Sequence, residues 1–181
     1  MSLAASPPPQ PAEDMSPRPS LAHADLSHQL ATELENVFGR SGPRRGGPGG
    51  WFFLQEPELQ LAGAPRNLIP DLAGWRRTRL PHLPRKAALD LAPDWVCEVL
   101  STSTAAKDRI WKLPLYFSAG VSHVWLVNPV LRYVEAFGRG DQTWILLGAY
   151  SEQDAAVRIP PFEGQALPLA ELWPDLDGEE G

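Results

Sequence analysis

Two acidic residues stand inside apolar stretches of the sequence. Glu98 lies in "APDWVCEVLS", and Asp71 follows a proline in "LIPDLAGW". With the two-residue period of a strand, Glu98 shares a face with Val96 and Leu100, so this face is not washed by solvent. A carboxylate in such a place must be paired, protonated or bound to a cation. Two carboxylates with room for water are what Mg²⁺ requires, and such a metal can bind a scissile phosphate and generate hydroxide.

Lys112 is the candidate for a third participant, a cation near an attacking water or a phosphate. It lies in "STSTAAKDRIWKLPLYFSAG", directly after the Glu98 strand, so a tight strand-to-helix turn would bring its ammonium group over the strand end. Asp108 lies four residues earlier on the same predicted helical face and could pair with it. A solvent-exposed ion pair between Asp108 and Lys112 is the alternative, and the spacing leaves both interpretations open.

The composition limits the class of protein. The chain has 181 residues, 43% of them hydrophobic, and no apolar run close to the ~18 residues of a membrane span, so we expect one globular domain and no membrane partner. Its first residues lack the basic start and apolar stretch of a secretion signal. The single cysteine, Cys97, allows no internal disulfide and reads as a small buried apolar residue. We therefore expect a cytoplasmic protein.

The charge is unevenly distributed. The formal net charge of −6 argues against a protein that coats nucleic acid through bulk electrostatics. Residues 66–112, however, hold nine Lys and Arg against five Asp and Glu, whereas residues 150–181 hold one Arg against eight acids. A polyanion is therefore expected to meet the middle of the chain and to avoid its end.

The elements that must position these residues follow from hydrophobic periodicity. Residues 1–20 hold six prolines and are predicted to form a disordered arm, followed by a single domain over 21–176 and an acidic tail over 177–181. Apolar residues at three- and four-residue intervals predict a helix from His23 to near Gly39. The loop "GRSGPRRGGPGG" that follows lacks the GK[ST] ending of a phosphate loop, and we interpret it as a flexible connection.

Short strand-like runs and one central helix complete the pattern. The helix spans "STSTAAKDRIWKLPLYFSAG", with Ser103 or Thr104 as its N-cap and Gly120 as its end, and Pro114 should kink it or delay its start. The predicted strands are "WFFLQ", "ELQLA", "NLIPDLAGW", "DWVCEVLS", "VSHVWLVNP", "LRYVEAF" and "QTWILLGAY". This order of elements predicts an α/β protein with a mixed sheet.

Several segments together resemble the Uma2 family of restriction-endonuclease-like proteins, within the PD-(D/E)XK nuclease superfamily. They are "MSPRPSLAH", "GGPGGWFFLQEPELQL", "IPDLAGWRR", "PDWVCEVLSTSTAAKDRIWKLPLYFSAGVSHVWLVNP" and "LPLAELWP". The run of "EVLS", "DRxxK", "Y", "GV" and "WLV" is specific in combination, although each piece alone is weak. The resemblance implies an α/β, restriction-endonuclease-like fold, in which a mixed β-sheet core is flanked by helices.

The resemblance also implies roles for individual residues. Asp71 matches the motif aspartate and Glu98 matches the D/E position, so both would ligate Mg²⁺ or Mn²⁺. The superfamily lysine is expected two residues after Glu98, where this chain has Leu100, and Lys112 would replace it from the helix. His23 matches the family's histidine and could support the site, with a capping or interface histidine as the alternative.

This sequence departs from the family pattern at its start. Longer members carry a glutamate-bearing segment where this chain has "AASPPPQPAED", which leaves a third acidic contribution to Glu13, Glu56 or Glu58. "STST" also lacks the proline that commonly follows the first serine, a change that concerns only the turn. A second Pro-Asp pair, at Asp94, opens the Glu98 strand, and we interpret it as a turn.

Two functions remain open after these observations. The first is a Mg²⁺-dependent DNA endonuclease in which Arg76, Arg77 and Arg79 hold phosphates beside the metal, while Trp75 stacks or merely packs. A solvated basic turn is the alternative for the three arginines. The second function is a nuclease-fold binding or accessory module with weak or absent cleavage. A non-nuclease hydrolase is not supported, because the sequence has no GxSxG, HExxH or CxxC motif.

A homodimer is also predicted. Seven Trp in a chain of this length suggest apolar surface that needs a partner, and two symmetric sites are the simplest way to cut both strands of a duplex.

Overall fold

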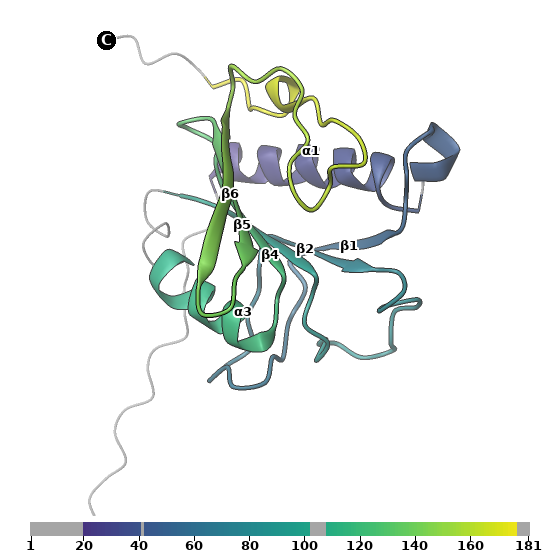
Figure 1. Cartoon of the computed structure of the whole chain (residues 1–181), viewed down its shortest axis with the longest axis vertical. Coiled ribbons are helices and arrows are strands. Elements are labelled where there is room, and N and C mark those ends of the chain that lie inside the picture. The colour runs from purple at the N-terminus through teal and green to yellow at the C-terminus, as the bar shows by residue number, and fades with distance from the viewer. Residues whose placement is uncertain (1–19, 41, 102–107, 177–181) are drawn as a thin grey trace, which may run out of the picture.

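One mixed sheet forms the centre of the molecule (Figure 1). The structure, a computed structural model, describes residues 20–40, 42–101 and 108–176. Within these residues, six strands lie side by side in the order of the sequence, with β3 and β4 parallel and all other neighbours antiparallel. They are β1 (Trp51–Gln55), β2 (Leu72–Arg76), β3 (Trp95–Val99), β4 (His123–Asn128), β5 (Tyr133–Arg139) and β6 (Trp144–Ser151). The predicted α/β class and mixed sheet are confirmed.

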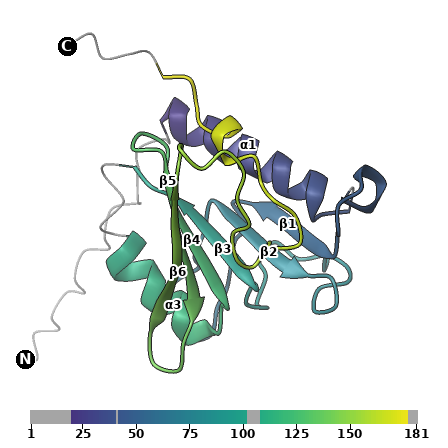
Figure 2. The ribbon, with the colours of Figure 1, turned by 45° about the horizontal axis from the view of Figure 1, so that its top comes forward.

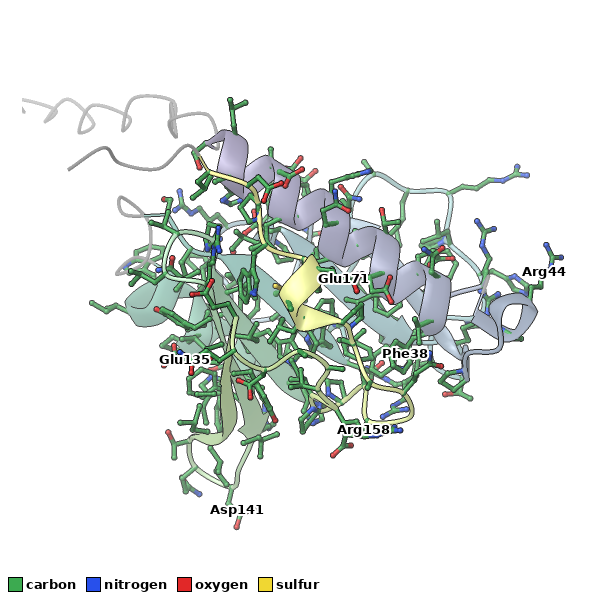
Figure 3. The ribbon with its side chains drawn as sticks, turned by 90° about the horizontal axis from the view of Figure 1, so that it is seen from above. Phe38, Arg44, Glu135, Asp141, Arg158 and Glu171 are labelled. Carbon is green, nitrogen blue, oxygen red and sulfur yellow. The ribbon has the colours of Figure 1, made fainter. Side chains whose placement is uncertain are left out.

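Helix α1 (Leu21–Val37) and the C-terminal segment cover one face of the sheet (Figure 2). The helix forms where predicted, because buried residues such as Leu26, Leu30 and Leu34 recur at four-residue intervals and face the sheet. Seen from above, Glu171, in the short 3-10 helix of the C-terminal segment, lies beside α1, whereas Asp141 marks the outlying tip of the β5–β6 hairpin (Figure 3). The resulting core is rich in aromatic rings, which centre on Phe162.

Helix α3 (Leu113–Ala119) and the loops before β2 and β3 cover the other face. A π-helical turn over Asp108–Lys112 precedes α3, and Pro114 stands at its start, so the proline delays the regular helix as predicted. Gly120 ends the helix with a φ of 89°, a left-handed conformation that suits glycine. The predicted N-caps, Ser103 and Thr104, lie outside the described residues.

Some predicted elements differ from the structure. "ELQLA" is not a strand: Leu59 and Leu61 are buried alternately as expected, but Leu59 alone makes isolated bridges, to Leu68 and Leu89. Pro57 has no N–H, and the turn at Gly63 follows, so a longer ladder cannot form. The glycine-rich loop runs from a helix into a strand, which is the reverse of a phosphate loop.

The predicted arm and tail fall almost wholly outside the described residues, which include only Ser20 of the arm. The single domain over 21–176 therefore stays a prediction. Among the described residues, no helix is both long enough and apolar enough to cross a membrane.

Candidate active site

Asp71 lies immediately before β2 and reaches across to the end of β3. In the antiparallel register Leu72 pairs with Cys97, so one step outward Asp71 lies opposite Glu98. The Asp71 Oδ2 atom accepts a hydrogen bond of 2.6 Å from the backbone N–H of Val99. Because Pro70 prevents the strand from starting earlier, the carboxylate takes the place of a ladder acceptor at this point.

Glu98 lies within β3, and its side chain is only 2% exposed. Lys112 donates from Nζ to Glu98 Oε2 at 2.7 Å, and Tyr116 donates its hydroxyl to Oε1 at 2.6 Å. Both carboxylate oxygens therefore have a donor, one of them an ammonium group. The buried glutamate is tolerated because it is paired and hydrogen-bonded.

Lys112 and Tyr116 reach Glu98 because they are four residues apart on one side of the helical segment. Lys112 closes the π-helical turn, and Tyr116 lies in the middle of α3, where it is fully buried. The role of Tyr116 was missed in the sequence. Its signal was the i,i+4 spacing from Lys112, combined with a hydroxyl that a buried tyrosine must bond to a partner.

His23 brings a third element to this end of the sheet. It lies in the first turn of α1, where the side chain of Ser20 caps the helix by accepting from the His23 N–H. The ring atom Nε2 lies 2.8 Å from Asp71 Oδ1. With Val99 on the other oxygen, Asp71 is held on both sides. The alternative of a purely capping histidine therefore does not describe its side chain.

The electrostatics of this region make Cys97 unreactive. Burial raises the pKa of the Cys97 thiol well above its usual range, and the negative charges of Asp71 and Glu98 raise this pKa further. The thiol stays neutral, as a small buried apolar residue would.

A family model, Uma2, described as "Putative restriction endonuclease", matches residues 12–170. The chain belongs to the Uma2 family. The chain is also similar to a solved structure, a "putative nuclease belonging to DUF820" from Anabaena variabilis, with a TM-score of 0.67 and 20% sequence identity over 87% of this chain and 83% of that chain. This likeness shows the shared fold. No curated protein matches the chain.

The three arginines predicted to hold phosphates in this Uma2 protein do not lie beside Asp71. Asp71 precedes β2 and Arg76 ends it, so five strand residues at ~3.3 Å each separate the two ends. Arg79 is instead paired with Asp94 at 2.8 Å, and Arg77 lies over the ring of Phe52. The prediction took closeness in sequence for closeness in space.

Two other residues near these arginines are structural. Trp75 is fully buried and donates its indole N–H to the carbonyl of Leu91, so it packs and cannot stack on a ligand. Asp94 precedes β3 in a bend, which agrees with its interpretation as a turn.

The candidates for a third acid differ in position. Glu56 donates its backbone N–H to the carbonyl of Asp71 at 3.0 Å, and its side chain is exposed. Glu58 accepts from Asn67 and is also exposed. Glu13 lies outside the described residues, as does the side chain of Asp108. In the part of the chain that the structure describes, no group of three or more His, Cys, Asp and Glu side chains could hold a metal.

The two carboxylates nevertheless fit a hard divalent cation. Asp71 is 17% exposed at its side chain, so water can reach it, and the carboxylate oxygens of both residues are the hard ligands that Mg²⁺ prefers. Mg²⁺ is commonly held by one or two carboxylates, with waters and substrate phosphates completing its shell. Asp71 and Glu98 are the residues that would hold it.

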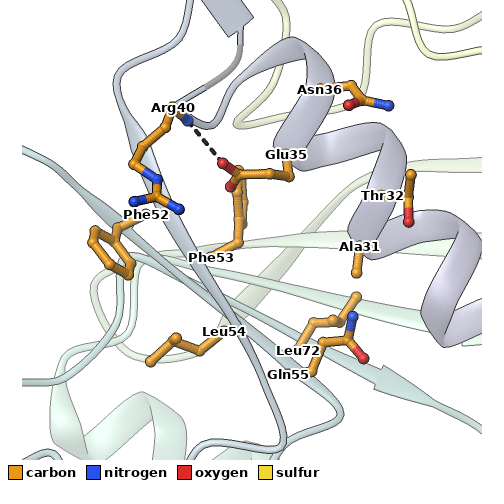
Figure 4. A pocket seen from close by; sticks show the side chains of 10 residues that line it. All are labelled: Ala31, Thr32, Glu35, Asn36, Arg40, Phe52, Phe53, Leu54, Gln55 and Leu72. Atoms are coloured by element: carbon orange, nitrogen blue, oxygen red, sulfur yellow. Dashed lines mark hydrogen bonds between the residues drawn. The ribbon is translucent and has the colours of Figure 1, made fainter. Parts of the chain in front are cut away.

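A cavity lies elsewhere, between α1 and β1 (Figure 4). It has a volume of about 370 Å³, and Glu35 and Arg40 stand at one end, where the Arg40 N–H donates to Glu35. Leu72 lines it, but the neighbouring Asp71 does not. The cavity therefore does not contain the residues that could do chemistry.

Proposed function

We propose that this Uma2 protein is a Mg²⁺- or Mn²⁺-dependent endonuclease that hydrolyses DNA phosphodiester bonds. The observation that carries the proposal is the meeting of Asp71, Glu98 and Lys112 at one end of β2 and β3, with Lys112 supplied from the helical segment. Family membership and the described nature of the structural neighbour support a nuclease.

The chain's own residues would divide the work as follows. Asp71 and Glu98 would hold the cation, which supplies a Lewis acid for the phosphate and a more acidic water. His23 orients the Asp71 carboxylate, and Tyr116 holds that of Glu98. The ammonium group of Lys112, fixed beside Glu98, can balance negative charge that develops on the phosphate.

A catalytically weak or inactive binding module is the second candidate. It is favoured by one feature: both oxygens of Glu98 already accept a hydrogen bond, and no third acid joins the pair among the described residues. A fold of this kind could bind DNA and leave cleavage to another protein.

Cleavage of supercoiled plasmid separates the two candidates. We expect nicking by the purified protein with Mg²⁺ or Mn²⁺, no nicking with EDTA, and none in Asp71→Ala. Binding without metal-dependent nicking would support the module and not the enzyme, whereas nicking that persists in Asp71→Ala would show that the cleavage does not come from the proposed site.

The partners follow from this function. DNA is the proposed substrate, and a cytoplasmic location would give access to it. A homodimer stays a prediction, and its best support is the edge strand β6, which carries no charged residue and exposes Ile145, Leu146 and Leu147. Natural edge strands usually carry charges or other features that prevent pairing. A monomer by light scattering at high concentration would contradict the dimer.

A further inference from the structure

Trp111 differs from the other tryptophans of the chain. It is 49% exposed, whereas the other six are buried or partly buried, and several lie in the aromatic core. About half of this large aromatic side chain is therefore available for contact with a ligand.

The position of Trp111 connects it with the candidate active site. It directly precedes Lys112, whose ammonium group binds Glu98. Consecutive helical side chains point in different directions, so Trp111 is exposed while Lys112 turns toward Glu98. On one face of the indole ring lies the guanidinium of Arg66, 5.3 Å from the ring centre. Arg66 belongs to the loop that leads into Asp71, so the ring links the helical segment that supplies Lys112 to the loop that supplies Asp71.

The chemistry of this pair suits a nucleobase. Aromatic rings stack on bases of any sequence, and an arginine nearby adds a cation for the backbone. The net charge of −6 limits the affinity that phosphate contacts alone can provide, whereas stacking does not depend on charge. Inside a duplex each base face is already stacked on its neighbours. A ring such as Trp111 therefore finds a free face only on an unpaired base.

We propose that Trp111, backed by Arg66, is a stacking platform for an unpaired base next to the cleaved phosphate, and that the protein prefers single-stranded or locally unpaired DNA. The position next to a cleaved phosphate rests on the proposed nuclease function, whereas the preference for unpaired DNA is tested by binding alone. Two more apolar side chains of these segments are exposed, Ile69 two residues before Asp71 and Ile110 directly before Trp111.

The test measures the affinity of the full chain for labelled DNA in EDTA, where no strand is cut. A single-stranded oligonucleotide and its blunt duplex are compared by fluorescence anisotropy for the wild type, Trp111→Ala and Trp111→Phe. Leu176→Ala, at an exposed apolar residue of the C-terminal segment, is the matched control. We expect tighter binding of the single strand, and a loss in Trp111→Ala of about 5- to 150-fold, the range of one base stack.

Two further readouts distinguish stacking from other roles. Trp111→Phe keeps a ring and should recover much of the affinity. The slope of log Kd against log salt should not change in Trp111→Ala, because stacking releases no counterions. Equal losses on single strand and duplex, an unchanged affinity in Trp111→Ala, or no preference of the wild type for single strands would overturn the proposal.

Failure of this proposal and failure of the nuclease proposal give different results. If the wild type does not nick DNA with Mg²⁺ but binds single strands through Trp111, the platform stands and the enzyme does not. If it nicks DNA while Trp111→Ala binds like the wild type, the enzyme stands and the platform does not.

Discussion

The two ends of the β2/β3 pair are built from the same local motif. At one end Pro70 and Asp71 precede β2, and the aspartate accepts from Val99 N–H at the end of β3. At the other end Asp94, also behind a proline, precedes β3 and accepts at 2.8 Å from the N–H of Arg76 at the end of β2. Each aspartate thus caps the partner strand where the ladder stops.

The ends differ in what else surrounds the carboxylate. Asp94 binds the guanidinium of Arg79, a permanent cation, and a single acid is neutralised. His123 stands beside it with a pKa lowered first by burial and then by the charge of Arg76. The result is a satisfied structural cluster.

The other end places two carboxylates together. Asp71 has His23 as its side-chain partner, and Glu98, opposite in register, has the ammonium of Lys112. Lys112 carries a compact charge on a flexible stem, unlike the planar fork of Arg79. A Pro-Asp pair at the start of a strand therefore caps the neighbouring strand at both ends of the β2/β3 pair. It becomes a candidate functional site only where a second acid lies beside it.

Asn at each aspartate gives the sharpest test of this difference. Asp71→Asn keeps an oxygen for Val99 N–H but removes the charge of a proposed metal ligand, so cleavage should fall at least about 100-fold. Asp94→Asn should retain most activity and lose about 1–2 kcal/mol of unfolding free energy, because the bond to Arg79 is weakened. Plasmid nicking and urea unfolding measure the two effects. Similar losses of activity in both variants would contradict the assignment of a catalytic role to Asp71 and a structural role to Asp94.

Lys112→Ala tests whether the cation at the candidate site acts in catalysis. We expect a loss of cleavage of about 100-fold or more, as for one positioned electrostatic group. Glu98 is buried, so loss of its charged donor should also lower the free energy of unfolding by about 1.5–3 kcal/mol.

Lys86→Ala is the matched control, because Lys86 forms an exposed ion pair with Asp90 and should be replaceable with little effect. Activity of Lys112→Ala close to that of Lys86→Ala, measured at a temperature where both are folded, would make the accessory module the better interpretation.

Tyr116→Phe removes only the hydroxyl that donates to Glu98 Oε1. Partners of this kind, which orient a metal ligand, typically contribute 10–100-fold to metal affinity or activity, so an effect of about that size is expected. If Tyr116 only fills the core, the metal concentration needed for half-maximal cleavage will not change. A rise in that concentration, with a folded variant, indicates the positioning role.

Most of the fold could be predicted from local patterns. The buried faces of β3 follow from alternation along "DWVCEVLS", and α1 follows from the spacing of its leucines. "ELQLA" failed because alternation of apolar residues reports burial, and a strand also needs a partner that can form a ladder. The local sequence pattern indicates which residues are buried, but it does not indicate whether a partner strand is available.

The candidate site was predictable only where an odd residue interrupted a pattern. An acid in an apolar run was visible at Asp71 and Glu98, whereas the hydrogen bonds of His23 and Tyr116 depend on how α1 and α3 lie against the sheet. The predicted position of Arg76 beside Asp71 was wrong, because the two residues lie at opposite ends of the extended strand β2. Tertiary packing, which no short motif records, decides these contacts.

The smallest expected effect is stabilisation of the folded protein by metal, which can be compared between the Asp71→Asn and Asp94→Asn variants. Mg²⁺ or Mn²⁺ that binds only the folded protein at ten times its Kd should raise the unfolding free energy by about 1.4 kcal/mol. For a chain of this size that corresponds to a rise in Tm of about 3–6 °C. Asp94→Asn, at the structural end, should show the same rise from its lower starting Tm. Asp71→Asn should show little, because a carboxylate that would hold the cation has become an amide. A rise of equal size in Asp71→Asn would mean that the cation binds away from the Asp71 and Glu98 end, and no rise in the wild type at millimolar metal would count against a metal site there.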